Sequence, residues 1–227
     1  TNNLYSGGDT PSKVVINGGK FSSSRSSAFY WPSAGTLTIG TEDGDNSAVS
    51  ITAENGSAVE ICSGTLQINS GTFVGKETFN SSESYAGPYR ENSGSGGPGD
   101  AVTVVARRAG GYINDPLSVT IAGGVFESSY NYGIRYIDCN EVQGADQLQQ
   151  NVTFTVSGGS FQGGAGAVNA EYIAEDEKLF ISGGLFSAKP VAFVQDDYVV
   201  VSTGNADYPY EVKMPEGTEE TAEVVAE

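Results

Sequence analysis

A short motif recurs along the chain and constrains its fold more than any other feature. Each copy consists of a short apolar run, a glycine and a phenylalanine, as in TFTVSGGSF at 153–161. Glycine always stands three positions after the last β-branched residue of the run, and phenylalanine five positions after it. Those last β-branched residues are Ile16, Ile68, Ile121, Val156 and Ile181. An internal repeat of this kind takes priority in choosing a fold.

The spacing within the motif predicts a strand and a sharp turn. Apolar residues alternate with a period of two, which is typical of a strand with one buried face. The glycine is expected at a positive φ, where the backbone turns, and the phenylalanine then returns to the core. A second strand follows each phenylalanine, with Phe29, Val102, Ile134 and Val168 as its first large residues. We therefore expect at least two strands in each repeat.

The segment between the first two copies indicates how the strands are arranged. LTI at 37–39, VSI at 49–51, VEI at 59–61 and LQI at 66–68 are four short strands separated by turns. The step from LTI to LQI is then one coil with three strands. Stacked coils bury a continuous core that no single unit can bury. The sequence therefore predicts an all-β chain folded as a right-handed parallel β-helix of about six or seven coils.

The repeats also suggest how the chain is divided. We expect β-helix repeats over 1–189, with an inserted surface loop at 74–99 that is polar and glycine-rich. Residues 190–214 contain further strands joined by a turn at TGNAD and are expected to form a C-terminal β cap. Residues 215–227 are acidic and unpatterned, as in a disordered linker.

Charge narrows the classes of partner. The chain has 28 acidic and 11 basic residues and a net charge of −17. This charge disfavours nucleic acid and anionic membranes as partners, and no apolar run is long enough to predict membrane insertion. Histidine is absent, and Cys62 and Cys139 are too few for a disulfide framework.

The motifs ISGGLF and VSGGSF, with GDAV and GIRY between them, resemble right-handed parallel β-helix (pectin-lyase-like) repeats. They look most like those of secreted or cell-surface proteins of Gram-positive gut bacteria, over about residues 10–205. The resemblance implies an extracellular location, secreted or attached to the cell wall. It implies less about activity, since this fold carries lyases, hydrolases, adhesins and inert stalks.

The function that we expect first is non-catalytic binding of a polysaccharide, or adhesion to a host surface glycan or protein. The residue after each core residue of the second strands should face outward and form a ladder. The ladder residues are Tyr30, Thr103, Arg135 and Asn169. Tyr85 and Tyr89 of the inserted loop would add to the surface, because tyrosine offers area with a polar tip.

One acidic turn is a candidate metal site. The segment EDGDN concentrates oxygen donors around a turn glycine, and calcium prefers such donors. The candidate ligands are Glu42, Asp43, Asp45 and Asn46. Calcium is therefore the one cofactor that we consider.

Two other functions stay open. The first is a calcium-dependent polysaccharide lyase of the pectate-lyase-like type, which the resemblance implies would need an arginine or lysine base. Arg135 and Arg107 are the candidates for that base, with Asp100 and Asp138 expected near them. The second is a structural stalk that holds another module away from the cell wall.

Overall fold

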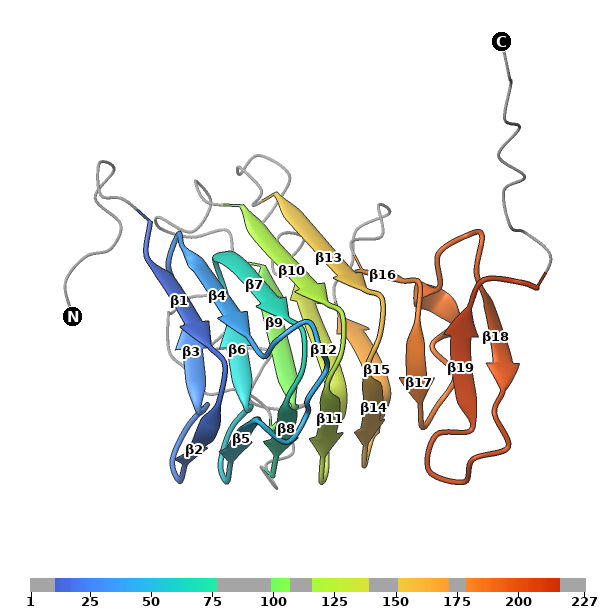
Figure 1. Cartoon of the computed structure of the whole chain (residues 1–227), viewed down its shortest axis with the longest axis horizontal. Helices are drawn as coiled ribbons and strands as arrows, with labels where there is room; N and C mark the ends of the chain where they lie inside the picture. Colours follow the sequence, from blue (N-terminus) through green and yellow to red (C-terminus); the bar gives the residue numbers. More distant parts are fainter. Residues whose placement is uncertain (1–10, 77–98, 107–115, 139–150, 172–178, 217–227) are drawn as a thin grey trace, which may run out of the picture.

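The chain folds into a parallel β-helix whose three sheets run along its length (Figure 1). The computed structural model describes residues 11–76, 99–106, 116–138, 151–171 and 179–216. The predicted β-helix is confirmed: corresponding strands of successive coils pair in parallel, and the first five coils pass through the three sheets in the same order. No helix in the described part of the chain is long and apolar enough to cross a membrane.

Each sheet takes one strand from each successive coil, except that the coil of β16 and β17 has no strand in sheet C. Sheet A contains β1 (Lys13–Ile16), β4 (Thr36–Ile39), β7 (Gly64–Ile68), β10 (Leu117–Ile121), β13 (Val152–Val156) and β16 (Leu179–Ile181). Sheet B contains β2 (Gly19–Ser23), β5 (Val49–Ala53), β8 (Thr72–Gly75), β11 (Val125–Ser128), β14 (Ser160–Gly163), β17 (Gly184–Phe186), β19 (Tyr210–Lys213) and β18 (Val199–Ser202). Sheet C contains β3 (Phe29–Trp31), β6 (Val59–Ile61), β9 (Val102–Ala106), β12 (Tyr132–Asp138) and β15 (Gly166–Glu171).

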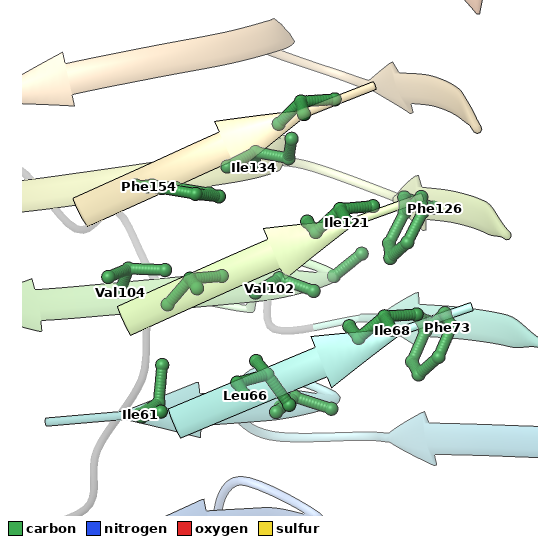
Figure 2. Packing of buried hydrophobic residues seen from close by; sticks show 14 of the residues in the cluster. Ile61, Leu66, Ile68, Phe73, Val102, Val104, Ile121, Phe126, Ile134 and Phe154 are labelled. Atoms are coloured by element: carbon green, nitrogen blue, oxygen red, sulfur yellow. The ribbon is translucent and has the colours of Figure 1, made fainter. Parts of the chain in front are cut away.

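The repeat phenylalanines form a stacked column inside the coils, and Figure 2 shows two of them. Ring centroids lie 4.9 Å apart for Phe73 and Phe126, 4.7 Å for Phe126 and Phe161, and 5.0 Å for Phe161 and Phe186. The planes are within 16° of parallel, so these rings stack face over face. The column is continuous because the strands of sheet B are in register at each phenylalanine. Ile51 takes the place of phenylalanine in the coil that lacks the motif.

The repeat glycines are required by both backbone and packing. All five have positive φ, from 104° at Gly159 to 131° at Gly71, which side chains other than hydrogen rarely tolerate. A Cβ at Gly124 would also lie 2.9 Å from the ring of Phe126. The ring therefore packs directly over the glycine two residues before it, which explains their fixed spacing.

The connections between sheets B and C differ greatly in length, yet the register is unchanged. Residues 164–165 join β14 to β15, whereas residues 76–101 join β8 to β9. On both sides of the longer connection the strands stay aligned, with Phe73 paired to Phe126 and Val59 paired to Val102. The added length therefore leaves the core of the coil as it is.

A β-hairpin covers the C-terminal end of sheet B. Strand β19 pairs antiparallel with β17, and β18 pairs antiparallel with β19. Tyr210 lies opposite Phe186, and Val212 is buried, so the hairpin continues the core. A 3₁₀ helix, η2 (Val191–Phe193), comes before it, and Val194 bridges to Ile181 of sheet A.

The N-terminal end lacks such a cover among the described residues. Strands β1, β2 and β3 are the last strands of their sheets. Val14 and Phe21 face the interior, since their partners in the next coil are Leu37 and Ile51, yet they are 37% and 36% exposed. Core positions are therefore open to solvent at this edge.

Candidate functional site

The four predicted ladder residues lie in one row of sheet C. The register of the five strands makes each residue of the row a partner of the next. The row is Tyr30, Glu60, Thr103, Arg135 and Asn169. Glu60 was not predicted, because its coil lacks the glycine-phenylalanine motif that marks the other strands.

The row points away from the coil interior but is not open to solvent at its centre. Glu60 and Thr103 are 0% exposed and Arg135 is 2% exposed, while Tyr30 and Asn169 are half-buried. Two residues further along the strands, Cys62, Val105 and Ile137 form a second small apolar cluster against Tyr30. The outer face of sheet C is therefore a packed surface in the described residues.

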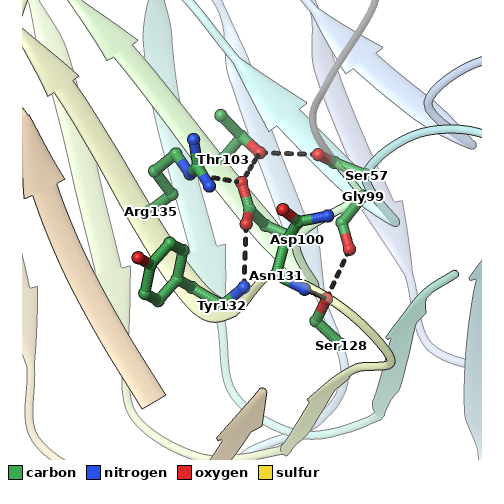
Figure 3. A network of polar contacts seen from close by, with 8 residues as sticks. All are labelled: Ser57, Gly99, Asp100, Thr103, Ser128, Asn131, Tyr132 and Arg135. Carbon is green, nitrogen blue, oxygen red and sulfur yellow. Dashed lines mark hydrogen bonds and ion pairs between the residues drawn. The ribbon is translucent and has the colours of Figure 1, made fainter. Parts of the chain in front are cut away.

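Asp100 organises a buried polar network at this face (Figure 3). Its Oδ2 accepts a hydrogen bond from Thr103 Oγ1 at 3.0 Å and lies 3.2 Å from Arg135 Nε. Its Oδ1 accepts from the backbone N–H of Tyr132 at 3.0 Å. Ser57 Oγ lies 2.6 Å from Thr103 Oγ1 and extends the network to the preceding coil. Buried polar groups require such partners, so the network links three successive coils.

The network bears on the lyase alternative. The side chains of Arg135 and Asp100 are 3% and 0% exposed, and the guanidinium also lies 4.9 Å from the ring of Tyr132. A general base must reach the substrate proton within hydrogen-bond distance. In the structure the Arg135 side chain is instead buried against Asp100 and Tyr132.

The acidic turn at 42–46 does not gather its carboxylates around one point. Asp45 Oδ1 accepts hydrogen bonds from the N–H and hydroxyl of Ser47 at 2.9 and 2.7 Å. The bond from the Ser47 hydroxyl is the main cause that lowers the pKa of Asp45. Asn46 Oδ1 accepts from Gly71 N at 3.0 Å, so it holds the turn against the next coil. No group of three or more acidic or cysteine side chains placed to hold a metal ion is found in the described residues.

A groove of about 490 Å³ runs along the corner between sheets A and B. It follows the turns between the two sheets, and five of its twelve lining residues are glycines. It is lined by Glu42, Gly44, Asn46, Asn69, Ala122, Gly123, Gly124, Gly159, Ser160, Gly184, Leu185 and Glu211. The repeat glycines Gly124, Gly159 and Gly184, which the fold requires, therefore also line this groove.

Polar groups are distributed along this corner groove. Glu42 and Asn46 of the acidic turn lie at its N-terminal end, and Glu211 of the hairpin lies at the other. Ser160 lies between them and is hydrogen-bonded to Tyr208, whose pKa is raised mainly by burial. The groove therefore offers carboxylate, amide and hydroxyl groups with negative charge at both ends.

A second and smaller groove lies at the corner between sheets B and C. Its volume is about 320 Å³. It is lined by Val74, Glu127, Ser128, Ser129, Gln162, Gly163 and Gly164. Strand β14 separates the two grooves, since Ser160 faces the first and Gln162 the second.

The remaining predicted residues cannot be placed in these sites. Tyr85, Tyr89 and Arg107 lie outside the described residues. Of the polar residues that line the corner groove, Glu42 and Asn46 were predicted, as calcium ligands, whereas Asn69, Ser160 and Glu211 were not. Four repeats carry a doubled glycine, at 18–19, 123–124, 158–159 and 183–184, and the last three of these contribute glycines to the groove.

Comparison with known proteins gives no relative. No protein-family model matches the chain, and no match was found among curated proteins or solved structures.

Proposed function

We propose that the chain is a non-catalytic extracellular module that binds a neutral glycan in the corner groove. Its source would be a secreted or wall-attached protein of the pectin-lyase-like type from a Gram-positive gut bacterium, as the repeat motifs suggest. The observation that carries the proposal is the groove itself, with its lining glycines and polar ends.

The dimensions of the groove suit a short oligosaccharide. From the turn before β5 to β19 it crosses five strand-to-strand steps, and at about 4.8 Å each they span about 24 Å. The glycines that line the groove let a flat chain approach the backbone closely at those positions. Asn69 and Ser160 supply the kind of polar groups that fix a ligand's orientation.

The negative charge of the groove favours neutral glycans over acidic ones. Glu42 and Glu211 lie at the two ends of the groove, and the whole chain carries −17. An acidic polysaccharide such as a polyuronate has the same sign and is repelled. The lyase alternative needs such a substrate and an accessible base, and the buried ion pair of Arg135 disfavours it as well.

A glycan array tests the proposal, with neutral and acidic glycans presented in calcium and in chelator. The variant is Ser160→Leu, which fills the centre of the corner groove and removes a hydroxyl. The matched control is Gln162→Leu, on the same strand but facing the smaller groove. We expect neutral glycans to bind to the wild-type chain. The affinity of Ser160→Leu for them should be at least about tenfold lower, and the affinity of Gln162→Leu should equal that of wild type.

Other outcomes overturn the proposal. A protein that binds no neutral glycan is better explained as a stalk or a protein-directed adhesin. An equal loss of glycan affinity in Ser160→Leu and Gln162→Leu would mean that the ligand does not bind specifically in the corner groove. Binding that chelator abolishes would bring the turn at 42–46 into the site as a calcium ligand.

A further inference from the structure

We propose that copies of this chain associate head to tail, with the N-terminal edge of one β-helix docked on the C-terminal hairpin of the next. The inference is independent of glycan binding. It rests on three observations on the described residues: open core positions at one end, an edge strand of the same sheet at the other, and opposite charge at the two ends.

The two ends are the two edges of one sheet. In the described residues, sheet B begins at β2 and ends at β18. Strand β18 is antiparallel to β19, and β19 is antiparallel to β17. Strand β18 therefore runs in the same direction as β17 and the other strands of the helix. Docking β2 of one copy beside β18 of another extends the sheet in parallel, as within the coils.

Apolar surface is available at both edges. Phe21 on β2 is 36% exposed and Val14 on β1 is 37% exposed, although both occupy core columns. At the other end Val199 on β18 is 38% exposed, and Val191 on η2 is 64% exposed. An uncovered strand edge with apolar side chains is a template for pairing with another chain.

The charges at the ends are complementary. Residues 11–41 contain Lys13, Lys20 and Arg25 and no acidic residue, and all three basic side chains are exposed. Residues 196–216 contain five acidic residues and one lysine. Asp196 and Asp197 are exposed and come directly before β18.

This charge pattern decides between the possible arrangements. Two N-terminal edges repel each other, and so do two hairpins, whereas an edge and a hairpin attract. The resulting contact joins two different surfaces, so it generates an open linear assembly rather than a closed dimer. In Figure 1 the two surfaces lie at opposite ends of the long axis, as a linear assembly requires.

Charge reversal tests the proposal. One variant carries Lys13→Glu, Lys20→Glu and Arg25→Glu, and the other carries Asp196→Lys, Asp197→Lys and Asp207→Lys. Mass is measured by light scattering after size exclusion, over a range of protein concentrations. The Debye length falls from about 30 Å at 0.01 M salt to about 3 Å at 1 M salt.

We expect the wild-type chain to form oligomers that grow with concentration at low salt and dissociate at high salt. Each variant alone should stay at the monomer mass of 23.5 kDa, because its two ends now carry like charge. An equal mixture of the two variants should regain the oligomers, which a loss of folding cannot imitate.

The proposal is overturned if wild-type protein is monomeric at every concentration and salt. It is also overturned if oligomers persist unchanged in either variant, since the contact then lies elsewhere. If both variants have the circular dichroism spectrum of wild type and their mixture still stays monomeric, the proposed contact between the N-terminal edge and the C-terminal hairpin is also excluded.

Discussion

The phenylalanine column should carry more of the stability than any other single row of side chains. Phe126 is fully buried and stacks on rings at 4.9 and 4.7 Å. Truncation of a buried phenylalanine to alanine costs about 3–5 kcal/mol. We expect Phe126→Ala to reach about 4–5 kcal/mol, because it also removes two ring contacts that are each worth about 0.5–1.5 kcal/mol.

Phe21→Ala is the matched control at the open end of the same column. Phe21 is 36% exposed and makes one edge-to-face contact, with Phe29 at 5.2 Å. Its truncation should cost only about 1–2 kcal/mol.

Urea unfolding and thermal melting, both followed by far-ultraviolet circular dichroism, compare the two variants with wild type. For a chain of this length, 1 kcal/mol shifts the melting temperature by about 2–4 °C. We therefore expect a fall of about 10–15 °C for Phe126→Ala and less than half of that for Phe21→Ala. Equal shifts in the two variants would refute the view that the stacked column holds the coils together.

Three further predictions concern the turns and the polar network. In thermal melts, Gly124→Ala should lower the free energy of unfolding by about 2–3 kcal/mol, because φ is +121° and the new Cβ meets the ring of Phe126. Gly44→Ala should lower it by only about 1 kcal/mol, because φ is +80° and the new Cβ meets no atom within 4 Å. Asp100→Asn should destabilise by about 3–5 kcal/mol in urea titrations, since it removes the buried carboxylate charge that lies 3.2 Å from Arg135 Nε. Ser47→Ala should raise the pKa of Asp45 toward its ordinary value of 3.8 in a carboxyl NMR titration. Because the native pKa is lowered, the stability that Asp45 contributes is present above pH 3.8 and is lost as the pH falls through the native pKa.

Much of the fold could be predicted because the repeat encodes it locally. The fixed offset between Gly124 and Phe126 predicted a positive φ and a buried ring, and both are confirmed. The strand at 59–61 was predicted without the motif, and it pairs where one coil of three strands requires.

The candidate site was harder to predict, for a physical reason. Alternation along a strand shows which side chains leave the coil interior, and the predicted row of Thr103 and Arg135 does leave it. Alternation does not show what packs on the outer face, so the burial of these residues could not be predicted. The corner groove could not be predicted either, because it is formed by turns from several coils, and the motif of one coil does not show that these turns line a common hollow.

The tolerance of one corner to added length has a practical consequence. The connections between sheets B and C extend from the two residues 164–165 to the span 76–101, and the strands on either side keep their pairing. Closing a loop of that length instead of a short one costs only about 2 kcal/mol of chain entropy. The corner is therefore a natural position at which to graft foreign peptides. Inserts at successive coils would be displayed in a row with a repeat of about 4.8 Å per coil.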